Sequence, residues 1–153
     1  MFRISQYMQE IKSPTPLCAK RQPPGPVVIW NLIRRCNLTC KHCYSISADK
    51  DFPGELSTQE IYGVMDDLKR FRVPVLILSG GEPLLRPDIF DIASRAKGLG
   101  FYVGLSSNGT LIDETNIRRI AETDFNYVGI SLDGIRETHD KFRRMAGAFE
   151  KSL

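Results

Sequence analysis

The sequence lacks three features that would place the protein in a particular class. It has no apolar run of about eighteen residues, the length that a membrane-spanning helix needs, and residues 1–6 lack the apolar core of a secretory signal. Neither sign of charge dominates, because 21 Lys and Arg are interspersed with 18 Asp and Glu for a net charge of +3. These absences predict a cytoplasmic protein that binds neither a membrane nor nucleic acid. At 153 residues with 42% hydrophobic content, the chain is about one domain long and can bury a core.

Cysteine is also scarce, with four in the chain, yet three of them lie within eight positions as Cys36, Cys40 and Cys43. In a reducing compartment such a cluster is more often a metal site than a set of disulfides. A structural zinc site uses four protein ligands, whereas three thiolates on a four-iron cluster leave one iron open to a small molecule. The spacing therefore favours an open iron-sulfur site. Cys18 lies among prolines without a partner at ligand spacing and is interpreted as an ordinary loop thiol.

Two other interpretations of the cysteine cluster stay open. In the first, the thiols are buried packing residues. In the second, a zinc site takes His42 as its fourth ligand, although His42 stands between Cys40 and Cys43, where its ring has an awkward reach to a shared metal. The other histidine, His139, is predicted to be a solvated helix residue rather than a catalytic one.

The N-terminal region, residues 1–25, is predicted to contain a short helix and a connector. Apolar residues recur at helical spacing over residues 3–12, which indicates an amphipathic helix that docks on the main body. Five prolines between positions 13 and 26 exclude regular structure and predict an extended connector. The folded core is expected to begin after it.

Residues 26–153 alternate between strand-like and helix-like segments. The expected strands are apolar runs that cover residues 27–33, 75–78, 101–105 and 127–131. The expected helices have apolar residues at helical spacing and cover residues 57–71, 88–98 and 113–122, with another beginning at 148. This alternation predicts an α/β fold of parallel βαβ units with right-handed crossovers. Four units are too few to close a barrel, which has about eight in its full form, so we expect a chain truncated before the remaining units.

A polar or glycine-rich signature follows the end of every expected strand. The cysteines follow the first strand, and the signatures after the other three are Ser79–Pro83, Ser106–Thr110 and Leu132–Gly134. Each of these alone is a common turn or a flexible link. Because the carboxyl ends of parallel strands face the active site in such folds, we expect all four signatures to converge on one mouth.

The residues within these signatures suit a particular kind of ligand. The pair Gly80 and Gly81 lets backbone groups approach a ligand closely, and Glu82 supplies a carboxylate suited to a ligand ammonium. Asn108 offers both a donor and an acceptor, and Asp133 can accept from hydroxyls. Together they suit an amino-acid head group and a ribose.

The three cysteines at this spacing, followed by Gly80-Gly81-Glu82-Pro83, resemble the radical S-adenosylmethionine (radical SAM) superfamily. The resemblance implies an enzyme with a partial TIM-like (β/α)6 barrel, of which about four βα units are present. It implies that the cysteines hold a four-iron, four-sulfur (4Fe-4S) cluster, whose fourth iron is chelated by the amino and carboxylate groups of SAM. It also implies that Gly80, Gly81 and Glu82 contact the SAM amino group.

Three further positions match the superfamily with less regularity. His42 stands where the superfamily has an aromatic contact to adenine, and Asn108 and Asp133 match positions that approach the SAM carboxylate or ribose. The glycine-rich adenine contact of a fifth strand has no counterpart. The implied chemistry is one-electron cleavage of the SAM sulfonium, followed by hydrogen abstraction from the substrate by a 5′-deoxyadenosyl radical. In this chemistry Glu82 binds and orients rather than acting as an acid or base.

A narrower resemblance, to the radical SAM family of haem d1 biosynthesis, rests on Met1–Tyr7, Pro24–Asn31 and Tyr44–Asp49. It implies a sirohaem-derived tetrapyrrole substrate that loses propionate side chains, together with an unidentified electron donor. Relatives carry a second iron-sulfur cluster in a C-terminal extension, which is absent here. The alternatives are a radical SAM peptide maturase and, from another class, a non-catalytic metal-binding module that holds zinc.

Overall fold

The computed structural model describes residues 25–153 of the chain. Its centre is one sheet of four strands in the order β1 (Val27–Ile33), β2 (Val75–Gly80), β3 (Tyr102–Ser107) and β4 (Tyr127–Ile130). Every neighbouring pair is parallel. The α/β fold with a parallel sheet, predicted from the alternation of apolar patterns, is therefore confirmed. The predicted N-terminal helix, the connector before residue 25 and Cys18 lie outside the described residues.

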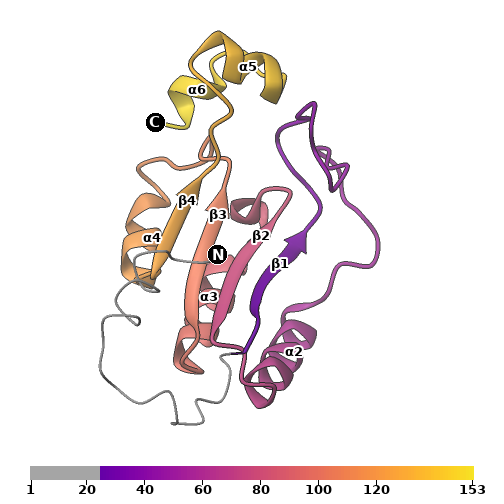
Figure 1. Cartoon of the computed structure of the whole chain (residues 1–153), viewed down its shortest axis with the longest axis vertical. Helices are drawn as coiled ribbons and strands as arrows, with labels where there is room; N and C mark the ends of the chain where they lie inside the picture. The colour runs from indigo at the N-terminus through magenta and orange to yellow at the C-terminus, as the bar shows by residue number, and fades with distance from the viewer. Residues whose placement is uncertain (1–24) are drawn as a thin grey trace, which may run out of the picture.

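Helices fill the connections between the strands (Figure 1). The crossover helices are α2 (Thr58–Arg70), α3 (Ile89–Gly98) and α4 (Ile117–Thr123), and a short 3-10 helix, η1 (Pro83–Leu85), precedes α3. Helix α3 lies behind the sheet and contacts α2, α4 and β3. After β4, the chain forms α5 (Glu137–Arg143) and α6 (Ala148–Lys151) above the carboxyl ends of the strands. None of the helices in the described part of the chain is long and apolar enough to cross a membrane.

Local interactions explain where two of the helices begin. At α2 a capping box is present, because the Ser57 hydroxyl accepts from the Glu60 N–H and the Glu60 carboxylate accepts from the Ser57 N–H at 2.8 Å. Helix α4 begins at residue 117 rather than at the expected 113, because the Asp113 carboxylate accepts the N–H groups of Thr115 and Asn116 at 2.9 and 3.0 Å in a turn. Side-chain hydrogen bonds of this kind compete with the first helical turn.

The core lies between the sheet and the crossover helices. Leu76 and Leu78 of β2 and Val103 and Leu105 of β3 are fully buried against α2 and α3. The helices contribute apolar side chains at the spacing that the sequence shows, and these are Ile61, Met65, Ile92, Ala93 and Ala96. Burial of this common core fixes the sheet with its strand ends aligned at one edge.

The helix expected over residues 57–71 includes Phe71, which the structure places just after α2. Phe71 is 74% exposed. The helix ends at Arg70, and Phe71 is its C-cap residue with ψ near 0°, so its side chain no longer projects from the face that Ile61 and Met65 share. The helix therefore ends one residue earlier than expected.

The contrast between Met65 and Phe71 is testable. Met65 is fully buried, and Met65→Ala is expected to lower the free energy of unfolding by about 2–5 kcal/mol, because it removes packed atoms and leaves a cavity. Phe71→Ala on the same helix is the control and is expected to change it by less than about 0.5 kcal/mol. Urea unfolding followed by circular dichroism measures both. An equal loss in the two variants would contradict this packing.

Candidate functional site

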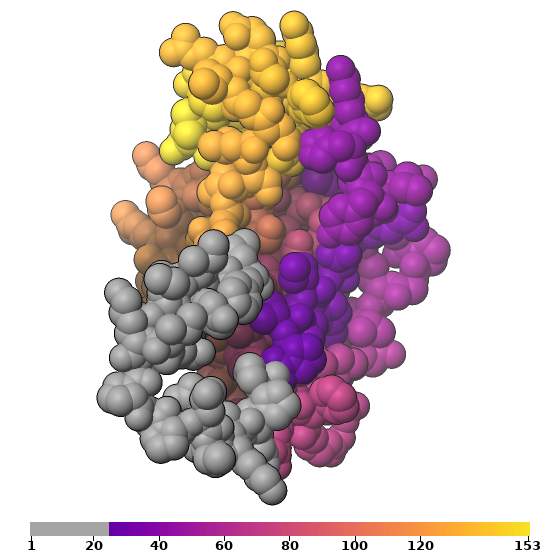
Figure 2. Space-filling view, in the orientation of Figure 1, coloured from indigo at the N-terminus to yellow at the C-terminus, as the bar shows by residue number. Residues whose placement is uncertain are grey.

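The four strand ends meet around one cleft of about 370 Å³. The cysteine loop arrives from β1, the glycine pair from β2, Asn108 from β3 and Asp133 from β4, as the sequence predicts. In Figure 2 the cysteine loop and the segment that carries α5 lie side by side at this end of the molecule. The predicted site residues that line the cleft are Cys36, Cys40, His42, Cys43, Gly80, Gly81, Asn108 and Asp133.

Backbone hydrogen bonds hold the irregular loop that carries the cysteines. The Cys36 N–H donates to the Ala48 carbonyl at 3.1 Å, which closes the base of the loop. The Lys41 N–H donates to the Phe142 carbonyl of α5 at 2.8 Å. Because the loop has no regular structure of its own, these contacts set where its thiols point.

The three thiols are free and lie in unequal environments. Cys36 is 5% exposed, and burial raises the pKa of its thiol. Cys43 is less buried; desolvation opposes its ionisation, but the hydrogen bonds from Ser45 and Ser47 outweigh this and lower its pKa to about 7. Cys43 is therefore the thiol that ionises more readily of the two.

The glycine pair is required by a close approach of two strand ends. The Gly81 N–H donates to the Ile33 carbonyl at 2.7 Å, and a Cβ added to Gly81 would lie 2.3 Å from the carbonyl oxygen of Arg35. Gly80 has a φ of +143°, which L side chains rarely adopt, and its Cβ would lie 2.2 Å from the Ile33 carbonyl oxygen. Both glycines thus let the exit of β2 pack directly on the exit of β1, at the wall of the cleft.

Glu82 is fully buried and does not line the cleft. Its carboxylate accepts three hydrogen bonds, from the Ser107 hydroxyl at 2.9 Å, the Asn108 N–H at 2.8 Å and the Leu84 N–H at 3.1 Å. Burial raises its pKa, and these hydrogen bonds oppose that rise. The carboxylate thus joins β2 to β3, and its contact with a ligand ammonium stays a prediction.

Asn108 contacts the cysteine loop from the end of β3. Its Nδ2 donates to the Asn37 side-chain oxygen at 3.0 Å and lies 3.8 Å from the Cys36 Sγ. Its Oδ1 accepts from the Thr110 N–H at 2.9 Å, which fixes the orientation of the amide. The donor and acceptor capacity predicted for Asn108 is thus directed toward the loop and its own turn.

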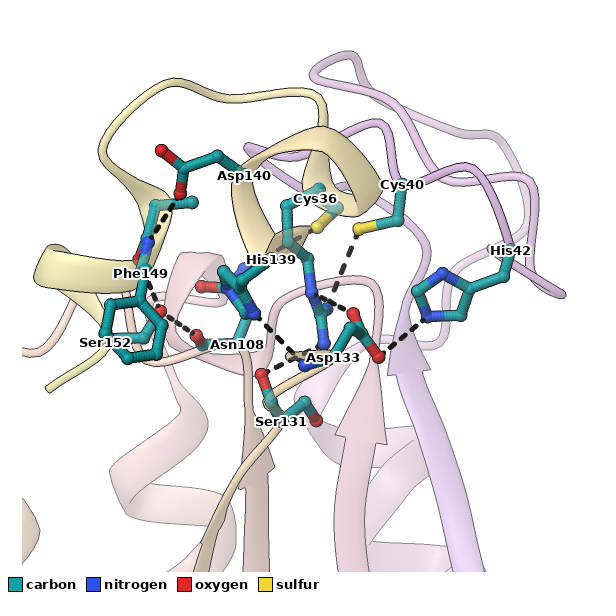
Figure 3. A network of polar contacts seen from close by, with 12 residues as sticks. Cys36, Cys40, His42, Asn108, Ser131, Asp133, His139, Asp140, Phe149 and Ser152 are labelled. Carbon is teal, nitrogen blue, oxygen red and sulfur yellow. Dashed lines mark hydrogen bonds and ion pairs between the residues drawn. The ribbon is translucent and has the colours of Figure 1, made fainter. Parts of the chain in front are cut away.

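Asp133 has a polar neighbour on each side within the network drawn in Figure 3. One carboxylate oxygen lies 2.7 Å from the Arg143 Nε and the other lies 3.5 Å from the His42 Nε2. His42 also packs edge-on against the Phe142 ring, with ring centroids 5.7 Å apart. Asp133 faces the cleft beside the Arg143 guanidinium, and its contact with a ribose stays a prediction.

His139 contradicts the expectation of a solvated residue. It is fully buried between the loop after β4 and α6. Its Nδ1 accepts the Asp133 N–H at 3.1 Å, and its ring packs edge-on against Phe149. The charged neighbours Arg136 and Asp140 favoured a solvated position in the sequence. In the structure His139 packs against Phe149 of α6, and its hydrogen bond fixes the position of Asp133.

The sequence model of the radical SAM superfamily matches residues 30–153. This chain belongs to the radical SAM superfamily. The matched range begins within β1 and contains the cysteine loop, β2, β3, β4 and every predicted site residue. Members of this superfamily use a 4Fe-4S cluster and SAM.

Three similar proteins illustrate the range of the superfamily near this chain. The pre-heme d1 synthase of Dinoroseobacter shibae is 54% identical over 153 residues, which are 100% of this chain and 38% of that protein. The Fe-coproporphyrin III synthase of Methanosarcina barkeri is 48% identical over 93% of this chain and 36% of its own length. Streptococcus suis SuiB bound to S-adenosylmethionine shares the fold with a TM-score of 0.68 at 16% identity, over 83% of this chain and 30% of that one. The chain therefore spans a little over a third of the curated relatives.

The residues around the cleft fit the superfamily's cluster. Three free thiols from one short loop line the same cleft, and thiolates are the ligands that iron-sulfur clusters take. Among residues 25–153, no group of three or more His, Cys, Asp or Glu side chains converges on the position of a single metal ion. Thiols that each bind a different iron do not need such a convergence. His42 pairs with Asp133 rather than joining the cysteines.

Arg143 is the functional residue that sequence reasoning missed. It lines the cleft and its Nη1 lies 3.7 Å from the Cys40 Sγ, across 103 positions of sequence. Ser45 and Ser47, which hydrogen-bond the Cys43 thiol, were also missed. Ser45 and Ser47 directly follow Cys43 in the sequence, and this proximity could have identified them. Nothing in the local sequence distinguishes Arg143 from its neighbour Arg144.

Substitution of Gly81 tests the close approach of β1 and β2. Gly81→Ala is expected to lower the free energy of unfolding by about 1–3 kcal/mol, because the added methyl overlaps the Arg35 carbonyl. The control is Gly63→Ala in α2, where no described heavy atom lies within 4 Å of the added Cβ; it is expected to stabilise by about 0.5–1 kcal/mol. Urea unfolding measures both. A neutral Gly81→Ala would contradict the geometry.

Glu82→Gln tests the buried carboxylate through pH dependence. The folded-state pKa of Glu82 is raised, so the stability it contributes below its unfolded pKa of about 4.3 is lost as pH rises through the folded-state pKa. Gln does not ionise. The free energy of unfolding of the wild type minus that of Glu82→Gln is therefore expected to fall as pH rises above about 4.

Glu60→Gln is the matched control for that measurement. Hydrogen bonds from Ser57 lower the pKa of the exposed Glu60 carboxylate, so its contribution is present above the unfolded pKa and is lost as pH falls. The wild-type minus variant difference should then rise with pH, opposite in sign to that for Glu82. The same slope in both variants would show that the burial of Glu82 does not set its ionisation.

Proposed function

We propose that this chain is the SAM-cleaving part of an enzyme of haem biosynthesis that acts on a tetrapyrrole. The more specific form of the proposal is the removal of propionate side chains from a sirohaem-derived tetrapyrrole. The observation that carries it is the 54% identity, over all 153 residues, to a pre-heme d1 synthase. The second relative, named as an Fe-coproporphyrin III synthase, supports a tetrapyrrole substrate in general.

In this proposal the cysteines bind the cluster and the glycine pair binds SAM. Cys36, Cys40 and Cys43 would hold the cluster as thiolates, and a reducing cytoplasm keeps them from forming disulfides before it binds. When bound, the cluster supplies the electron that cleaves SAM to methionine and a 5′-deoxyadenosyl radical. The backbone at Gly80 and Gly81 offers polar groups to the SAM amino-acid end, because both glycines line the cleft without a side chain.

The remaining residues orient the ligand or support the residues that do. His42 is half-exposed at the rim of the cleft and suits a stacking contact with adenine. The Asn108 amide faces the cleft beside Cys36 and suits a polar end of SAM. Glu82 holds the end of β3 from behind the cleft wall, and Asp133 faces the cleft in an ion pair with Arg143. The protein's contribution is to exclude water and hold these groups in place.

SAM cleavage is the first test. The protein is reconstituted anaerobically with iron and sulfide and incubated with SAM and dithionite, and 5′-deoxyadenosine is measured by mass spectrometry. The wild type is expected to form it, and Cys40→Ala to lose at least about a hundredfold, because one cluster ligand is gone. Cys18→Ala is the matched control and is expected to retain activity. Equal product from Cys40→Ala and the wild type would contradict the proposal.

The substrate is tested separately with the reconstituted protein. Incubation with the sirohaem-derived tetrapyrrole is expected to give a product lighter by the mass of the lost propionate groups. SAM cleavage with an unchanged tetrapyrrole mass would reject this substrate and favour the peptide alternative. The two assays therefore separate a failure of the radical chemistry from a wrong substrate.

A further inference from the structure

Arg143 is a buried cation placed against the cysteine loop. It is the last residue of α5 and is 7% exposed. Its Nε lies 2.7 Å from the Asp133 carboxylate, its Nη2 donates to the Ser131 carbonyl at 3.0 Å, and its Nη1 lies 3.7 Å from the Cys40 Sγ. The guanidinium thus spans the loop after β4 and the cysteine loop.

Contacts on both sides fix this placement. The Asp133 backbone N–H is bound by the buried His139 ring, so the carboxylate that anchors Arg143 is itself held. The Asp140 carboxylate accepts the N–H groups of Gly147 and Phe149 at 2.6 and 2.9 Å, which ties α5 to α6. Next to Arg143, the Phe142 carbonyl accepts from Lys41 in the cysteine loop. A planar guanidinium with several donors can serve all three of its partners at once, which a Lys ammonium cannot do with the same geometry.

The thiols differ in what donates to them. Within residues 25–153, the hydrogen-bond partners of the Cys36 and Cys43 thiols are neutral groups of Leu38, Asn108, Ser45 and Ser47. Arg143 is the charged donor of the set, and it points at Cys40. Hydrogen bonds and charges at the sulfur ligands are among the factors that set the reduction potential of an iron-sulfur cluster. A cation there stabilises the reduced cluster, which carries one more negative charge.

We infer that Arg143 is a positioning residue that raises the one-electron reduction potential of the cluster through Cys40, and that Asp133 limits this effect. The inference rests on the superfamily's cluster and not on the tetrapyrrole, so it stands whatever the substrate proves to be. Reduction by dithionite adds one electron to the cluster and breaks no bond. Arg143 therefore raises the reduction potential of the cluster, and Asp133 lowers it.

The opposite signs give the test. Arg143→Gln removes the cation and leaves Asp133 negative, so the cluster becomes harder to reduce. Asp133→Asn removes the anion at nearly the same shape and leaves Arg143 positive, so the cluster becomes easier to reduce. Two residues with a merely structural role would not move the potential in opposite directions, because loss of packing or of cluster changes both variants alike.

The measurement is a redox titration of the anaerobically reconstituted protein without SAM, in which electron paramagnetic resonance reports the reduced cluster. At a fixed solution potential, Arg143→Gln is expected to lower the ratio of reduced to oxidised cluster about tenfold, which corresponds to about 59 mV for one electron. Asp133→Asn is expected to raise this ratio. Arg143→Lys, which keeps the charge without the three contacts, is expected to fall between the wild type and Arg143→Gln.

Arg136→Gln is the matched control. Arg136 precedes the same helix and carries the same charge, but its side chain is 71% exposed and its carboxylate partner, Glu150, is 3.9 Å away. Its removal is expected to change the ratio by less than about twofold, because solvent screens exposed charges. Iron content and the visible spectrum report whether each variant holds its cluster. If Arg143→Gln fails to assemble one, Arg143→Lys and Asp133→Asn still decide the sign.

Shifts in the same direction for Arg143→Gln and Asp133→Asn would overturn the inference. So would an Arg143→Gln cluster that assembles fully and titrates like that of Arg136→Gln. A failure to cleave SAM with these shifts intact would count against the proposed function alone, since the titration does not involve SAM or any substrate.

Discussion

The buried carboxylate of Glu82 is the interaction on which the site depends. The carboxylate is shielded from solvent and accepts hydrogen bonds from the Ser107 hydroxyl and the Asn108 N–H at the end of β3. The backbone N–H of Glu82 donates to the Arg35 carbonyl beyond β1. Three strand exits are therefore joined through one residue. A buried charge is tolerated only where such hydrogen bonds compensate for lost hydration. The hydrogen bonds of Glu82 also hold the ends of β1, β2 and β3 together at the cleft.

Two sets of contacts connect the strand ends around Glu82 to the cysteine loop. Along one, Asn108 contacts Asn37 and the Cys36 thiol. Along the other, Arg143 and Asp133 connect the loop after β4 to the Cys40 thiol. A loop without regular structure thus gains a defined shape from residues at the ends of β3 and α5. Such support from behind is what orients ligands to a metal centre.

The sequence predicted the architecture well because its signals are local. Apolar runs, helical spacing and the Ser57 and Glu60 capping box each depend on neighbours in the chain, and the structure confirms the strands and α2 that they predict. The cysteine spacing and the glycine pair were also visible, since the approach of β2 to β1 requires residues without side chains at Gly80 and Gly81. Boundaries were less accurate where side chains competed with the helix, as at Asp113.

The sequence by itself determined the parallel α/β fold, the three thiols and the convergence of the strand ends on one cleft. The tertiary structure alone decided how the charges are arranged there. It turned Glu82 away from the cleft, paired Asp133 with Arg143 and buried His139 beneath α6. The physical reason is that burial and ion pairing depend on distances between segments far apart in the chain, such as the 103 positions between Cys40 and Arg143. No local pattern encodes such distances.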